Sequence, residues 1–118
     1  MKKKIICFDI DNIICKTIKN DYSKSKPKRK IIKLINELYD KGYIIKIHTA
    51  RYMGRTNDNI IKANKIGYKK TYSQLKSWGV KFNKLFLSKP SFDVYVDDKN
   101  LYHKSNWVKD LKSKLLKN

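Results

Sequence analysis

Cysteine, proline and glycine are scarce in this chain of 118 residues, which contains two, two and four of them. The two cysteines, Cys7 and Cys15, exclude a disulfide framework and a zinc site with four cysteine ligands. No apolar run approaches the roughly 20 residues that a membrane-spanning helix needs. Asp9 and Asp11 interrupt the first apolar stretch too early for a signal peptide. We therefore expect a cytoplasmic protein with no membrane span.

Acidic residues are also few, at ten against 29 lysines and arginines, so the net charge is +19. Such a balance makes a nucleic-acid partner worth testing. Arginine, whose planar fork suits phosphate groups, is nevertheless confined to Arg29, Arg51 and Arg55. The abundant lysine, isoleucine and asparagine are encoded by A/T-rich codons, so biased codon usage explains much of the charge. We favour a solvated coat of lysines over a dedicated nucleic-acid surface.

The length and the hydrophobic content of 41% predict one domain over residues 1–118 with a single core. Short apolar runs predict strands over residues 3–10, 43–49, 80–87 and 92–96, with a loop over 11–26. Strands that alternate with helical patterns predict an α/β fold with a parallel sheet. The expected helices run from Ser25 and Pro27 to Gly42, from Thr56 or Asn57 through Asn64 to Gly67, from a capping-box pattern at Thr71 and Gln74 to Gly79, and from Ser105 or Asn106 through Leu115.

Four of the ten acidic residues follow two of the predicted strands. Asp9 and Asp11 end the first strand, and Asp97 and Asp98 end the fourth. Each pair alone is also typical of a turn or a cap. Parallel strands present their carboxyl ends at one edge of a sheet, where four carboxylates repel one another unless a cation intervenes. Oxygen ligands of this kind suit Mg²⁺, so we predict a magnesium site there.

Two further residues occupy matching positions at the other strand ends. Thr49 ends the second predicted strand, and its hydroxyl with the neighbouring backbone N–H groups suits a phosphoryl oxygen. Lys89 follows the third strand, and an ammonium there neutralises phosphate. Asn12 and Ala50, which directly follow Asp11 and Thr49, complete the predicted phosphate-binding set. At each position an ordinary turn or surface residue is the alternative.

Together these motifs resemble those of the haloacid dehalogenase (HAD) superfamily of phosphohydrolases. Phe8-Asp9-Ile10-Asp11 is similar to the first motif of that family, and the segment from Ile45 to Thr49 is similar to the second. Lys89-Pro90 and the segment from Val94 to Asp98 are similar to the third and fourth. The resemblance covers nearly the whole chain and implies a Rossmann-like parallel sheet flanked by helices. The only insertion sites, residues 12–26 and 50–71, leave no room for a large cap domain.

The resemblance also implies a role for each matching residue. Asp9 would be the nucleophile that forms an aspartyl-phosphate, and Asp11 would protonate the leaving group and then activate water. Thr49 and Lys89 would hold the phosphoryl group. Mg²⁺ would be held by the metal-ligand set Asp9, Asp11 through its backbone carbonyl, Asp97 and Asp98.

The chain departs from the family pattern directly after the second aspartate. Asn12-Ile13 stands where the family usually has Gly-Thr. Asparagine tolerates the left-handed backbone that glycine adopts, so we expect the turn to persist. Ile13 has no hydroxyl, so we expect the hydrogen bond of the family threonine to be lost, with reduced activity as a consequence.

We therefore expect a Mg²⁺-dependent phosphomonoester hydrolase acting on a sugar phosphate or another small phosphorylated metabolite. The sugar is favoured because Thr-Ala-Arg at 49–51 and Trp-Gly-Val at 78–80 resemble a compact subgroup often associated with capsule or surface-polysaccharide synthesis. Arg51 and Arg55 follow Thr49 and lie near the predicted phosphate, where they are either substrate contacts or solvent-exposed charges; Arg51 is the candidate substrate contact. An uncapped site in a basic protein also suits a phosphorylated nucleic-acid end. A third possibility is a non-enzymatic nucleic-acid-binding module, because aromatic residues interleave with lysines over residues 68–72.

Overall fold

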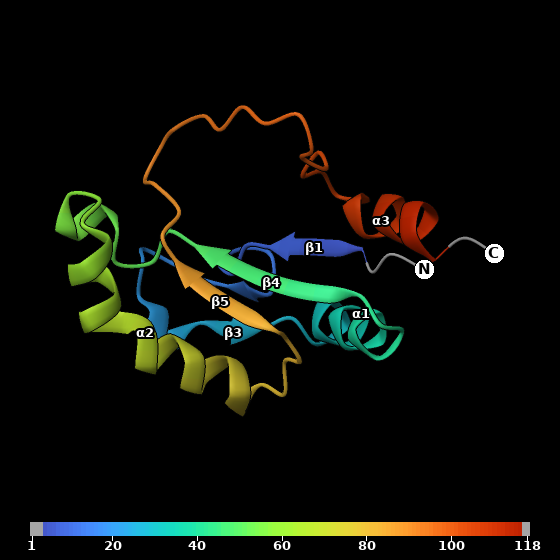
Figure 1. The fold of residues 1–118 in the computed structure, drawn as a ribbon, viewed down its shortest axis with the longest axis horizontal. Coiled ribbons are helices and arrows are strands. Elements are labelled where there is room, and N and C mark those ends of the chain that lie inside the picture. The colour runs from blue at the N-terminus through green and yellow to red at the C-terminus, as the bar shows by residue number, and fades with distance from the viewer. Residues whose placement is uncertain (1–3, 117–118) are drawn as a thin grey trace.

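Three parallel strands form the central sheet, in the order β1–β4–β5 (Figure 1). In the computed structural model, which describes residues 4–116, they are β1 (Ile5–Phe8), β4 (Ile44–Thr49) and β5 (Lys84–Leu87). The predicted parallel α/β sheet is thus confirmed, although Lys3 of the first predicted strand lies outside the described residues. β5 begins four residues later than the predicted strand over 80–87.

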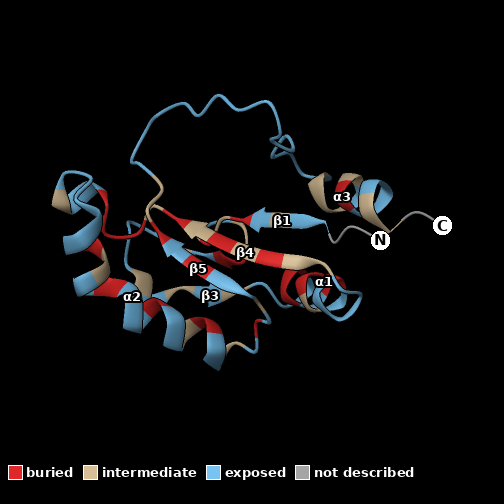
Figure 2. Cartoon of the chain, viewed as in Figure 1, coloured by how far each residue is buried: buried red, intermediate tan, exposed pale blue. Residues whose placement is uncertain are grey.

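One face of the sheet carries most of the core. Phe8 lies beside Ile47, and Ile47 lies beside Leu85 on the next strand; all three are buried. Side chains alternate between the faces of a strand, so the isoleucines of β4 that point to this face are buried while their neighbours Lys46 and His48 are half-buried. Figure 2 shows this alternation along β4.

Three α-helices surround the sheet: α1 (Arg29–Asp40), α2 (Ile60–Ser77) and α3 (Trp107–Leu115). α1 packs against β4 and α2 packs against β5, and both lie on the same side of the sheet, while α3 lies on the other side (Figure 1). The predicted amphipathic face of α1 is confirmed, because Ile31, Leu34, Ile35 and Leu38 are all buried. Among the described residues, no helix is long and apolar enough to cross a membrane.

The prediction of two helices between residues 56 and 79 is wrong, because α2 is one helix that continues through Gly67. Its N-cap is Asn59, whose side chain accepts a hydrogen bond from the Lys62 N–H at 3.0 Å. Gly67 does not end the helix. A Cβ atom at this position would overlap the ring of Tyr52, so glycine is needed there for a close side-chain approach.

The start of α1 also differs from the prediction. Residues 15–27 contain a small antiparallel pair, β2 (Cys15–Lys16) with β3 (Lys26–Pro27), and a short 3₁₀ helix η1 (Tyr22–Lys24) between them. Pro27 therefore lies in β3, and the N-cap of α1 is Lys28 instead of Ser25. The predicted loop over 11–26 is partly ordered by this pairing.

The predicted fourth strand over residues 92–96 is wrong. The chain from Pro90 to Asn106 is irregular and exposed, and it arches away from the sheet before α3 begins (Figure 1). Val94 and Val96 are 79% and 91% exposed. β-Branched residues favour a strand only where a neighbouring strand pairs with them. This segment pairs with none of the described strands.

Candidate active site

A cleft of about 440 Å³ opens where β1, β4 and β5 end at their carboxyl edge. Seven predicted residues line it together: Asp9, Asp11, Asn12, Thr49, Ala50, Arg51 and Lys89. Asp9 directly follows β1, Thr49 is the last residue of β4, and Lys89 follows β5 by two residues. The parallel topology alone brings these positions to one edge. Further walls come from two loop segments, residues 50–55 and 89–92.

Asp9 lies at the base of this cleft with one cation beside it. Its Oδ1 accepts a hydrogen bond from the Ile10 N–H at 2.8 Å, and its Oδ2 lies 3.5 Å from the Lys89 Nζ. Burial raises the pKa of Asp9 above its ordinary value, and the nearby Lys89 ammonium opposes that rise. A carboxylate with a single cationic neighbour keeps part of its oxygen surface open toward the cleft.

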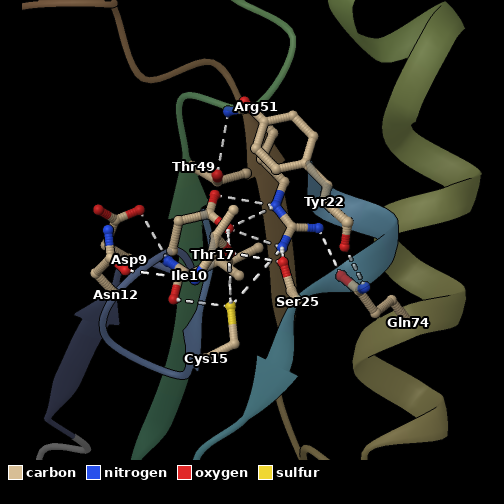
Figure 3. A network of polar contacts seen from close by, with 11 residues as sticks. Asp9, Ile10, Asn12, Cys15, Thr17, Tyr22, Ser25, Thr49, Arg51 and Gln74 are labelled. Atoms are coloured by element: carbon tan, nitrogen blue, oxygen red, sulfur yellow. Dashed lines mark hydrogen bonds and ion pairs between the residues drawn. The ribbon is translucent and has the colours of Figure 1, made fainter. Parts of the chain in front are cut away.

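Asp11 is held far more tightly than Asp9, by the fork of Arg51. Figure 3 shows Arg51 among Thr17, Tyr22 and Gln74. Arg51 Nε donates to Asp11 Oδ2 at 3.0 Å and Nη2 donates to Oδ1 at 2.9 Å. The Thr17 hydroxyl donates to Oδ1 at 2.6 Å. The Arg51 side chain is only 2% exposed, and such a two-pronged pair fixes the orientation of a carboxylate as well as its charge.

Two further contacts hold Arg51 in this position, and one of the two partners, Gln74, is itself bound to Tyr22. Its Nη1 donates to Gln74 Oε1 at 2.6 Å, and Gln74 Nε2 donates to the Tyr22 carbonyl at 2.7 Å. Its guanidinium lies over the Tyr22 ring, 4.6 Å from the ring centroid. The predicted alternative of a solvent-exposed Arg51 is wrong, because the side chain is buried and its donors are directed at Asp11 and Gln74. Arg51 thus acts as a positioning residue for Asp11.

Sequence reasoning missed several members of this network. The predicted capping box at Thr71 and Gln74 is wrong, because both residues lie within α2, and the Gln74 side chain instead bonds to Arg51. Thr17 and Tyr22 carried no signal at all in a stretch without periodicity. Their contacts to Asp11 and Arg51 join segments that only the folded chain brings together.

The turn after Asp11 follows the prediction for asparagine. Asn12 has a left-handed backbone with φ of 65°, and its Oδ1 accepts from the Thr17 N–H at 3.4 Å. Ile13 supplies no hydroxyl here. The Thr17 hydroxyl, four residues further along, donates to Asp11 instead.

Thr49 and Lys89 connect the ends of β4 and β5. The Thr49 hydroxyl oxygen accepts from the Arg51 N–H at 3.1 Å, and the Thr49 carbonyl accepts from the Lys89 N–H at 3.2 Å. The hydroxyl retains its own proton to donate to a ligand in the cleft. Thr49 is fully buried, so the position of its hydroxyl oxygen is fixed by the surrounding side chains.

Asp97 and Asp98 are not brought to the cleft. Both are exposed, and the Lys99 N–H, which donates to Asp97 Oδ1 at 3.0 Å, lowers the pKa of Asp97. Within residues 4–116, no three histidine, cysteine, aspartate or glutamate side chains lie close enough together to hold a metal ion. The predicted convergence of four carboxylates is therefore absent from this structure, because the segment that carries two of them forms no strand.

The oxygen atoms that remain available as ligands in the cleft meet only part of what Mg²⁺ requires. Arg51 and Thr17 occupy the oxygens of Asp11, which leaves the Asp9 carboxylate and main-chain carbonyls. Mg²⁺ typically takes one or two carboxylates and completes its shell with water and substrate phosphate. Asp9 fits that pattern as a ligand, whereas the full predicted set does not.

No protein-family model and no curated protein sequence matches the chain. Among solved structures, the fold is similar to that of an MCSG target from Vibrio cholerae, with a TM-score of 0.77 and 22% identity over 94% of this chain and 98% of that one. It is also similar to part of a chain in the Pnkp1/Rnl/Hen1 complex, with a TM-score of 0.54 and 15% identity. That match covers 95% of this chain and 33% of the other. At these identities the likeness shows the α/β fold alone.

Proposed function

We propose that the chain is a phosphomonoester hydrolase of the HAD type, with Asp9 as the nucleophile. The observation that carries the proposal is the contrast between two neighbouring carboxylates in one cleft. Asp11 is locked by Arg51 and Thr17, whereas Asp9 has Lys89 as its one ionic partner among the described residues. An anionic nucleophile that meets a phosphate needs positive charge beside it, and Lys89 supplies that charge.

The proposed reaction has two steps. In the first, an Asp9 oxygen bonds to phosphorus while the bond from phosphorus to the leaving oxygen breaks, and Asp11 gives that oxygen a proton. In the second, water attacks the phosphorus of the aspartyl-phosphate, Asp11 takes a proton from the water, and phosphate leaves with Asp9 restored.

Mg²⁺ is the cofactor of this proposal, with Asp9 as a ligand in the cleft and Asp97 and Asp98 as predicted ligands from the exposed segment. When bound, the ion would offset the negative charge that the nucleophile and the phosphate bring together. The first substrates to test are sugar phosphates and other small phosphorylated metabolites, because the cleft has room for a small ester and no cap domain covers it within residues 4–116.

The test is hydrolysis of an aryl phosphate by the purified protein in the presence of Mg²⁺. Asp9→Asn should abolish turnover, because an amide cannot form the acyl-phosphate intermediate. Asp40→Asn, which removes an exposed carboxylate on α1, is the matched control and should retain activity within about twofold. Full activity of Asp9→Asn, or full activity in excess chelator, contradicts the proposed mechanism.

A further inference from the structure

Arg55 lies at the mouth of the cleft, in the 3₁₀ helix η2 (Gly54–Thr56). Its guanidinium lies over the ring of Tyr52, at 4.7 Å from the centroid, and 5.6 Å from the centroid of the Tyr22 ring. The side chain is exposed, and within residues 4–116 no carboxylate lies within ion-pair distance of it. An arginine supported by two aromatic faces keeps all its donors available to an anion.

Two locally unfavourable features accompany the position of the Tyr52 ring under Arg55. Tyr52 has a left-handed backbone with φ of 67°, a conformation that is strained for a bulky side chain. Its ring is 8% exposed and packs where Gly67 of α2 has no side chain. The Tyr22 ring meets it edge to face at 5.1 Å. Strain of this kind persists where the surroundings hold a residue in place, and it is common at binding sites.

The segment that follows β5 is held against the loop that contains η2. The Ser91 N–H donates to Asp58 Oδ1 at 3.1 Å, and Ser91 lies next to Gly54. Beyond it, Phe92 packs against Tyr95 at 4.8 Å and lies 5.2 Å from Lys89 Nζ. The cleft is therefore lined by aromatic side chains beside both cations, with Tyr22 and Tyr52 next to Arg55 and Phe92 next to Lys89.

The cleft is lined by more cationic side chains than carboxylates. Two carboxylates, Asp9 and Asp11, are each paired with a cation, Lys89 and Arg51 respectively. Arg55 is a third cation without a carboxylate of its own in the described chain. One phosphomonoester at Asp9 engages Lys89, and the charge of Arg55 at the mouth then remains unmatched.

We propose that Arg55, supported by Tyr22 and Tyr52, binds a second phosphate group of the substrate. The inference rests on the proposed phosphomonoesterase and narrows its substrate class to esters that carry two phosphate groups. A nucleoside bisphosphate and the phosphorylated end of a nucleic-acid strand, where a phosphodiester is the second group, share this chemistry. A sugar monophosphate lacks it.

The experiment compares three substrates in the presence of Mg²⁺: thymidine 3′-monophosphate, thymidine 3′,5′-bisphosphate and the 3′-phosphorylated dinucleotide TpTp. The wild-type protein should prefer the two larger substrates by at least tenfold in kcat/KM. Arg55→Gln should reduce that preference at least tenfold, and Arg55→Lys should restore it in part because it keeps the charge without the planar fork. Arg29→Gln, which removes an exposed arginine outside the cleft, should leave the preference unchanged.

A preference that is unchanged in Arg55→Gln, in protein with the wild-type thermal midpoint, overturns the inference. The same data distinguish the two kinds of substrate. A higher kcat/KM for TpTp than for the bisphosphate identifies a nucleic-acid strand end, and a higher value for the bisphosphate identifies a small molecule. Equal values show that Arg55 recognises the phosphate alone, as proposed.

A binding measurement separates this inference from the proposed function. Thymidine 3′,5′-bisphosphate is titrated calorimetrically into Asp9→Asn, alone and combined with Arg55→Gln or Arg29→Gln. The inference requires the Kd to rise at least tenfold with Arg55→Gln and to stay within twofold with Arg29→Gln. Arg55-dependent binding without any wild-type turnover would refute the phosphatase and keep the second-phosphate site. Turnover by the wild-type protein without Arg55-dependent binding would support the phosphatase and refute the second-phosphate site.

Discussion

The two aspartates of the cleft differ because their neighbours differ, even though one residue separates them in the chain. Asp11 meets the Arg51 fork and the Thr17 hydroxyl, and Arg51 is in turn bound by Gln74 of α2. Asp9 meets one lysine and one backbone N–H. Two carboxylates with such different partners suit two different roles in one reaction.

Arg51→Lys tests the positioning of Asp11. Lysine keeps one charge but loses the two-pronged geometry, so kcat should fall about tenfold or more while KM changes less. Arg29→Lys is the control and should change neither constant. A rise in KM at unchanged kcat would instead support the substrate contact that the sequence suggested.

The titration of Asp9 is a second test at this scale. Burial raises the pKa of Asp9 from the ordinary value of 3.8, so the folded, metal-free protein binds this proton more tightly than the unfolded chain. The stabilising contribution is therefore complete below that ordinary value and is lost as the pH rises through the raised pKa. Because Lys89 opposes the shift, Lys89→Gln should raise the pKa of Asp9 further.

The measurement is a carboxyl ¹³C NMR titration of metal-free protein, which follows Asp9 without depending on turnover. Lys81→Gln, which removes the exposed partner of Asp40, is the control and should leave the Asp9 titration unchanged. A lower Asp9 pKa in Lys89→Gln would contradict the assigned contact. Activity alone does not separate the two carboxyls, because neighbouring groups titrate as a pair.

At the scale of elements, α2 shows how one close contact overrides a local signal. Glycine is unfavourable in a helix interior by about 1 kcal/mol relative to alanine, so its place in an 18-residue helix needs a reason. The reason is the Tyr52 ring, which occupies the space of the missing side chain. The same contact holds the ring under Arg55 at the mouth of the cleft.

Gly67→Ala should therefore lower the free energy of unfolding by about 1–3 kcal/mol, despite the better helix propensity of alanine. Urea denaturation measures the change, and Ser73→Ala on the exposed face of the same helix should be neutral or slightly stabilising. In a Tyr52→Ala background the overlap is gone, so Gly67→Ala should then stabilise the protein. Equal effects in both backgrounds would show that the ring contact is not the cause.

At the scale of the whole molecule, the exposed segment from Pro90 to Asn106 separates the sheet from α3. α3 is anchored through the buried Leu111 and through the Tyr43 hydroxyl, which donates to the Leu115 carbonyl at 2.7 Å. Between these anchors the segment carries Asp97 and Asp98, the two predicted metal ligands that the cleft lacks. Among the described strands, β1 pairs with β4 alone and lies at an edge of the sheet.

If Asp97 and Asp98 are ligands, Mg²⁺ together with a phosphate analogue such as orthovanadate must draw this segment toward Asp9. Amide hydrogen exchange over residues 94–99 should then slow when both are added, and Asp98→Asn should remove most of that protection. Asp93→Asn, an exposed carboxylate on the same segment, is the control. Unchanged exchange in a protein with Mg²⁺-dependent activity would exclude both residues as ligands.

The amino-acid sequence by itself determined the parallel α/β architecture and the gathering of Asp9, Asp11, Thr49 and Lys89. Apolar runs and helical spacing are local, and strand ends in a parallel sheet meet at one edge whatever the loops do. The left-handed turn at Asn12 was predictable for the same reason, because it depends on the conformational freedom of one residue.

Only the tertiary structure decided which side chains surround those aspartates. Arg51 reaches Asp11 across 40 positions of the chain, and Gln74 reaches the Tyr22 carbonyl across 52. No period or cap signal encodes such contacts. Tertiary packing likewise carried α2 through Gly67, and it left residues 92–96 without a strand partner. A helix or strand signal describes a preference of a few neighbouring residues, whereas a side-chain contact depends on where distant segments meet after the core has formed.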